Sequence, residues 1–138
     1  YAHGNEPSHH IIYMYNMLGE QERGCRLLRR VMNEMYNDRP EGLCGNEHCG
    51  QMSAWYVMTA LGLYQVEPAG GRYYFGSPTV KEATIQLPGG KMLRILAHRN
   101  SPKRITVERV LWNGRQLDTN YIMHQELAQG GTLEFYMK

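Results

Sequence analysis

The sequence predicts an α+β fold in which three helices come first and an antiparallel, hairpin-rich β segment follows. Apolar residues recur every three or four positions through residues 7–63, which is the helical period. After residues 68–71, a Pro-Ala-Gly-Gly turn, apolar and polar residues alternate, which is typical of half-buried strands. We therefore expect a helical part, residues 1–66, and a β segment, residues 67–138.

Each of the three helices has recognisable ends. The first, residues 7–18, opens with Pro7, whose missing N–H costs nothing in the first turn of a helix. Gly19 ends it, and the second helix covers residues 21–36 before an Asn-Asp-Arg-Pro stretch. A long loop then leads to the third helix, residues 51–63.

The β segment is expected to begin with a hairpin. Residues 83–87 and 93–97 both alternate apolar with polar side chains, and a Pro-Gly-Gly turn lies between them. Residues 105–112 predict another strand, and its alternation changes phase near Arg109, which indicates a β-bulge. An Asn-Gly turn follows, and residues 132–136 predict the last strand.

Composition narrows the class of protein. The net charge of +2 is too small to indicate nucleic-acid binding, and Arg26, Arg29 and Arg30 are expected to form a solvated helix face. No apolar run approaches the roughly 20 residues that span a bilayer. Three cysteines, an odd number, argue against a complete disulfide framework. Because the chain opens without Met and inside a motif, we expect an upstream portion of the same polypeptide.

Two polar motifs interrupt the amphipathic pattern, each just before a predicted helix. They are residues 3–10, HGNEPSHH, and residues 45–51, GNEHCGQ. Each contains Gly-Asn-Glu, which on its own suits helix capping, because Asn is a good N-cap and a carboxylate favours a helix N-terminus. The added histidines favour a shared site instead, with hard oxygen ligands and imidazoles that suit sugar hydroxyls and calcium.

The two motifs are expected to lie side by side. Helices that run in the same direction bring their N-termini to the same end, and packed helices have axes roughly 8–10 Å apart. Five side chains would then converge on one pocket: Glu6, His9, Asn46, Glu47 and His48. A zinc site is a further alternative, since histidines 9, 10 and 48 and cysteines 44 and 49 are near the motifs, but their spacing fits zinc poorly.

The motifs, in this order, resemble those of glycoside hydrolase family 92, the calcium-dependent α-mannosidases. The similar strings are Gly4–His10, Gly42–Glu47, Gly50–Val57, Ala60–Tyr64, Phe75–Pro78 and Leu111–Gly114, so that the resemblance extends over essentially the whole chain. It implies an enzyme with an N-terminal β-sandwich and an (α/α)6 catalytic barrel. The three helices would be the last helices of that barrel.

The resemblance also implies roles for individual residues. The family hydrolyses α-mannosides with inversion, which needs a general acid and a separate general base; the acid would lie upstream of Tyr1. The catalytic candidates are His48, which occupies the position of the family's base, an Asp, and its neighbour Glu47. The remaining candidates are Asn5 and Glu6 for calcium, and His3, His9, His10 and Asn46 for substrate.

Further expectations concern the whole protein. A non-catalytic relative that binds mannose or mannose-containing glycans is the alternative, because His48 replaces the base. Tyr1 and Ala2 occupy the positions of a His-Glu pair found in α-1,2-specific members, so another linkage is expected. By resemblance the protein is periplasmic, on the cell surface or secreted. The isolated chain is expected to be inactive and to self-associate through the stripes Leu27–Val31–Met35 and Trp55–Thr59–Leu63.

Overall fold

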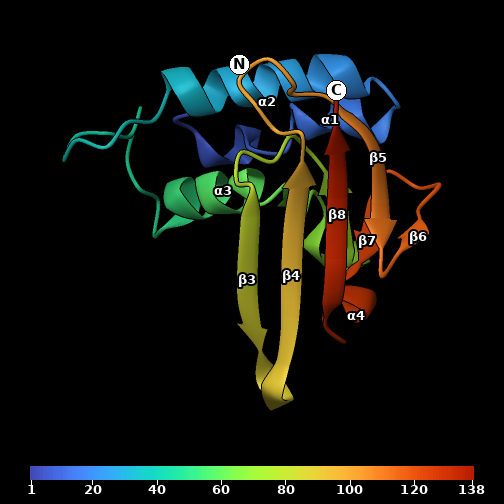
Figure 1. The fold of residues 1–138 in the computed structure, drawn as a ribbon. Helices are drawn as coiled ribbons and strands as arrows, with labels where there is room; N and C mark the ends of the chain where they lie inside the picture. The colour runs from blue at the N-terminus through green and yellow to red at the C-terminus, as the bar shows by residue number, and fades with distance from the viewer.

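The computed structural model describes residues 1–138 and confirms the α+β class (Figure 1). The α-helices are α1 Tyr13–Met17, α2 Gln21–Glu34, α3 Gln51–Ala60 and α4 His124–Leu127. Short 3-10 helices cover Glu6–Ser8, Pro68–Gly70 and Pro88–Gly90. The strands are β1 Leu63–Tyr64, β2 Arg72–Phe75, β3 Glu82–Leu87, β4 Lys91–His98, β5 Val107–Trp112, β6 Arg115–Gln116, β7 Tyr121–Met123 and β8 Gly131–Met137.

The strands form two sheets, and one pairing departs from the predicted antiparallel order. The smaller sheet has the order β1-β2-β7, and the larger has the order β3-β4-β8-β5-β6. The predicted β3–β4 hairpin is confirmed and extends away from the helices in Figure 1. The last strand, β8, inserts between β4 and β5 and runs parallel to β4, so the segment is mixed rather than purely antiparallel. The predicted bulge is confirmed between Val107 and Arg109.

Two hydrophobic clusters hold these layers together. One lies between the sheets, where the ring of Phe75 on β2 meets that of Phe135 on β8 edge-on at 5.6 Å. The other joins the helices to the smaller sheet and includes Tyr13, Leu28 and Trp55. Helix α2, drawn across the top of Figure 1, packs against α1 and contacts β5 of the larger sheet.

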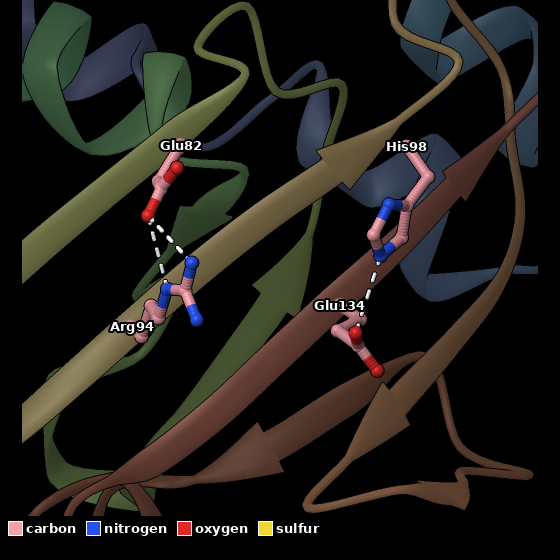
Figure 2. Close-up of polar contacts among 4 residues, drawn as sticks. All are labelled: Glu82, Arg94, His98 and Glu134. Carbon is pink, nitrogen blue, oxygen red and sulfur yellow. Dashed lines mark hydrogen bonds and ion pairs between the residues drawn. The ribbon is translucent and has the colours of Figure 1, made fainter.

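The outer face of the larger sheet carries charged cross-strand pairs. Figure 2 shows Arg94 of β4 donating to Glu82 of β3, with Nη2 and Oε1 2.8 Å apart. It also shows His98 of β4 beside Glu134 of β8, with Nε2 and Oε1 3.2 Å apart. These pairs alternate along β4 with buried residues such as Ile95, as the period-two pattern requires.

The first predicted helix is shorter and more irregular than expected. Only Tyr13–Met17 is α-helical, and Glu6–Ser8 is a 3-10 turn. Between them the backbone bonds join residues three apart, for example Ile11 N–H to the Ser8 carbonyl. The third helix also ends early, because Gly62 adopts φ 91° and Leu63 enters β1.

Two expectations about exposure are wrong. Most of the two stripes is covered within the chain: Val31, Trp55, Thr59 and Leu63 are buried, and Leu27 and Met35 are half-buried. Arg29 is also buried, because its guanidinium donates to the Ser77 hydroxyl, the Pro78 carbonyl and Asn100 Oδ1. It ties α2 to the loop between β2 and β3 instead of facing water. The exposed apolar side chains lie elsewhere, at Ile11, Met14, Leu18, Tyr56 and Val57 among others.

The helices are few and short. None has the length and apolarity needed to cross a bilayer.

Candidate functional site

The two polar motifs touch each other, as predicted. A β-carbon added to Gly4 would lie 2.9 Å from the Cys44 carbonyl oxygen, and one added to Gly45 would lie 3.0 Å from Gly4 Cα. Segments some forty residues apart in sequence therefore meet backbone to backbone. Glycine is needed at both positions because any side chain would separate the two loops.

His48 bridges the two motifs. Its Nε2 lies 3.1 Å from the Gly4 carbonyl oxygen, and its Nδ1 lies 3.1 Å from Glu6 Oε2. Since a carbonyl oxygen only accepts, Nε2 carries a hydrogen and donates it. Both ring nitrogens are thus engaged by the chain. His48 and Cys49 reach this position through left-handed backbone, with φ 52° and 57°, a conformation that concentrates at functional sites in non-glycine residues.

Glu47 turns away from His48 and caps helix α3. Its Oε1 accepts from the Ser53 backbone N–H at 2.8 Å, and its Oε2 accepts from the Ser53 hydroxyl at 2.6 Å. These hydrogen bonds, the hydroxyl first, lower the pKa of the Glu47 carboxyl. The carboxylate is held ionised at the helix N-terminus, where the helix dipole also favours it.

His3 and His9 are buried beneath the motifs. Their rings stack with centroids 4.5 Å apart, and each is 1% exposed. His3 Nε2 lies 2.6 Å from the Tyr36 hydroxyl, which itself donates to the Met52 carbonyl, so His3 Nε2 carries the hydrogen. Burial lowers the pKa of His3 to about 4 and also lowers that of His9. Both imidazoles are therefore neutral near pH 7.

The polar cavity beside the motifs has a volume of about 330 Å³. Its polar lining includes Glu6, His10, Gln51 and Tyr64, together with one side of His9. Gln51 and Tyr64 were not among the predicted site residues. Gln51 is the last residue of the second motif and the first residue of α3, and this position is a signal that sequence reasoning could have used.

The remaining predicted residues, Asn5 and Asn46, are exposed and their side chains make no hydrogen bond within the chain. Asn5 is next to Glu6, so an amide oxygen and a carboxylate are available together at the first motif. Asn46 lies at the rim of the second motif and does not line the cavity.

The donor set decides which metals the chain could hold. No three His, Cys, Asp or Glu side chains converge, so the zinc alternative is wrong, and all three cysteines are free. Calcium takes six to eight oxygen ligands. The side chains of Asn5 and Glu6 have the right chemistry for it and offer only part of that number.

The comparisons with known proteins all point to one family. The family model for the glycosyl hydrolase family 92 catalytic domain matches residues 1–138. The solved α-mannosidase BT3965 of Bacteroides thetaiotaomicron, in complex with mannoimidazole, superposes with a TM-score of 0.93 at 37% identity over 99% of this chain and 18% of that one. The inverting mannosidase BT2199 of the same organism gives 0.91 at 43% identity, over 100% and 19%.

A curated relative, an uncharacterised secreted glycosidase of Arthroderma benhamiae, is 27% identical over 134 residues, which cover 95% of this chain and 17% of the relative. The chain thus spans less than a fifth of the length of each of these proteins. The match over every residue, the high structural similarity and the contact between the Gly-Asn-Glu motifs lead to one conclusion: the chain belongs to glycosyl hydrolase family 92, as part of its catalytic domain.

Proposed function

We propose that the chain is part of an exported α-mannosidase that removes terminal α-linked mannose from glycans with inversion. The observation that carries the proposal is the contact between Glu6 and His48, which joins the two motifs beside a polar cavity. The mannosidases BT3965 and BT2199, one bound to mannoimidazole and the other an inverting enzyme, support the substrate class and the stereochemistry. The secreted fungal relative supports export.

In this proposal the chain supplies half of the catalytic machinery. Its helices are the last ones of an (α/α)6 barrel, and the general acid belongs to the upstream portion of the polypeptide. Calcium, when bound, polarises and orients sugar hydroxyls, and Asn5 and Glu6 would contribute oxygen ligands to it. His48 occupies the position of the family's base, in contact with Glu6, and would orient the attacking water.

The partners of the two ring nitrogens limit how His48 can act as a general base. A general base needs a ring nitrogen without a hydrogen facing the water, whereas Nε2 of His48 carries a hydrogen toward the Gly4 carbonyl and Nδ1 faces the Glu6 carboxylate. To accept a proton from water, Nδ1 must carry no hydrogen and must turn from Glu6 toward the water. Glu47 is a weaker candidate, since both of its oxygens are bonded to Ser53 and its pKa is lowered.

The same observation favours a second candidate function, a mannose-binding relative that has lost its base. Such a protein would keep the oxygen ligands of Asn5 and Glu6 and the cavity, and it would use His48 only to hold the two motifs together. Turnover distinguishes the two functions, because a binder is stabilised by its ligand without hydrolysing it.

The test uses the full-length protein and methyl α-mannoside. His48→Ala should lower kcat at least tenfold, and Glu6→Gln should raise the calcium concentration needed for half-maximal activity. His98→Ala is the matched control, because it removes another His–Glu pair, on the outer sheet face, and should leave both quantities unchanged. Ligand-induced stabilisation of a wild-type protein that releases no mannose would establish the binder instead. Mannose release by the isolated chain would contradict its proposed dependence on upstream residues.

A further inference from the structure

The hydrogen-bond network below the cavity has one self-consistent arrangement of hydrogens. His9 Nε2 lies 2.8 Å from the His3 carbonyl oxygen, which can only accept, so Nε2 carries a hydrogen. The His9 Nδ1 atom faces the side-chain nitrogen of Gln51, which can only donate, so Nδ1 carries no hydrogen. His9 Nδ1 must therefore accept from Gln51, whose side-chain nitrogen is 3.0 Å away.

This arrangement fixes the orientation of the Gln51 amide. Its nitrogen donates one hydrogen to His9 Nδ1 and the other to the Tyr64 hydroxyl oxygen, also at 3.0 Å. Two polar groups are then left without a partner in the chain: the Gln51 carbonyl oxygen, an acceptor, and the Tyr64 O–H, a donor. The Gln51 oxygen is not a buried unsatisfied atom, and both residues line the polar cavity next to Glu6.

We propose that Gln51 and Tyr64 form a sugar-binding subsite in this cavity, where Gln51 accepts from one hydroxyl and Tyr64 donates to the neighbouring hydroxyl of the same mannosyl unit. Adjacent sugar hydroxyls present a donor and an acceptor side by side, and an uncharged donor–acceptor pair complements them. The cavity of about 330 Å³ is large enough for one pyranose ring. The inference rests on the proposed function, because it assumes that the cavity receives a mannoside.

The network also explains why this pair is held rigidly. Tyr64 stacks on the buried ring of Tyr13 with centroids 5.1 Å apart, and Trp55 donates to the His9 carbonyl at 2.9 Å. Each partner of Gln51 is thus itself positioned by a buried side chain. A ligand would meet groups that need no reorganisation, which reduces the entropic cost of binding.

The experiment compares the full-length wild-type protein with one variant, and tests both with a mannoside and with analogues that each lack one hydroxyl. Tyr64→Phe keeps the stacked ring and removes only the donor, and the ligands are methyl α-mannoside and its four monodeoxy analogues. We expect Tyr64→Phe to raise KM about five- to tenfold, with a smaller change in kcat. For one monodeoxy analogue, wild type and variant should have the same KM, because the missing hydroxyl and the missing donor belong to one hydrogen bond.

Tyr73→Phe is the control, since Tyr73 is a half-buried tyrosine whose hydroxyl lies 3.1 Å from His124 Nδ1, away from this cavity. It should leave KM unchanged for every ligand. An unchanged KM in Tyr64→Phe, or the same fold-loss with all four analogues, would overturn the subsite while the mannosidase function stands. If wild type binds methyl α-mannoside without turnover, dissociation constants replace KM in the same comparison. A wild type that neither hydrolyses nor binds the mannoside overturns both proposals.

Discussion

At the scale of single residues, two neighbouring side chains of the second motif have different partners. Both carboxylate oxygens of Glu47 accept hydrogen bonds from Ser53, whereas His48 contacts the first motif. His48 itself has left-handed backbone, with φ 52°. The motif thus both starts a helix and contributes to the site.

The lowered pKa of Glu47 predicts a pH-dependent stability. A carboxyl whose pKa falls on folding contributes stability above its ordinary value, 4.5, and loses it as pH drops through the lower folded value. Glu47→Gln should therefore lower the melting temperature of the full-length protein at pH 7, with a difference that shrinks below pH 4.5. Glu41→Gln, an exposed loop substitution, is the control. A deficit of the same size at pH 3 and pH 7 would contradict a contribution from the ionised carboxylate.

Residue types in the site could be read from the sequence, but their contacts could not. The Gly-Asn-Glu motifs predicted that Glu6 and His48 lie together, and their side chains are in contact. The predicted convergence of Asn46 and Glu47 on the same pocket is wrong, because neither lines the cavity and Glu47 is bonded to Ser53. His3 and His9 have the same chemistry as His48 and are nevertheless buried with ring nitrogens engaged, because Tyr36 and Gln51 reach them from distant parts of the chain. Their predicted role in binding substrate stays a prediction; the structure shows only that His9 borders the cavity.

At the scale of elements, the spacing of apolar residues predicted those helices and strands whose contacts join residues close in sequence. Helices α2 and α3 and the β3–β4 hairpin were expected close to their observed positions. The smaller sheet was missed because β1, β2 and β7 are two to four residues long, too short for an alternating pattern. The parallel alignment of β8 with β4 was missed because their pairing joins residues almost forty positions apart.

The joint between α2 and the β segment depends on Arg29. Arg29→Met removes a buried cation and leaves the acceptors on Ser77, Pro78 and Asn100 without donors. The expected loss is about 2–4 kcal/mol in the free energy of unfolding, measured by urea denaturation of the transition that includes this segment. Arg29→Lys should restore little, because an ammonium cannot reproduce the planar fork of a guanidinium.

Arg30→Ala is the control on the same helix, because it leaves the contacts of Arg29 with the β segment intact. Arg30 pairs with Glu34 on the exposed side of α2, and exposed pairs of this kind contribute about 0.3–0.5 kcal/mol. Equal losses from Arg29→Met and Arg30→Ala would show that the buried contacts of Arg29 do not hold α2 to the loop after β2.

At the scale of the whole molecule, the chain has a covered core and an uncovered helical edge. Its two clusters bury large aromatic residues such as Phe75, Phe135 and Trp55, and Trp55 belongs to a stripe that was expected to be exposed. The edge consists instead of α1 and the residues on either side of it, where Ile11, Met14 and Leu18 are 40%, 45% and 79% exposed. The relatives are more than five times as long as the chain, so they contain ample additional structure that could pack here.

This edge predicts how the isolated chain behaves in solution. Exposed apolar patches mark interaction faces, so the chain should self-associate through α1 when the rest of the polypeptide is absent. Replacing Met14 and Leu18 together by Lys should shift the sedimentation profile toward monomer at high concentration. The control is the double substitution of Val57 and Tyr56 by Lys on the exposed side of α3. Association that persists in the α1 variant and disappears in the α3 variant would relocate the interaction face to α3, and a wild-type chain that stays monomeric would refute the prediction altogether.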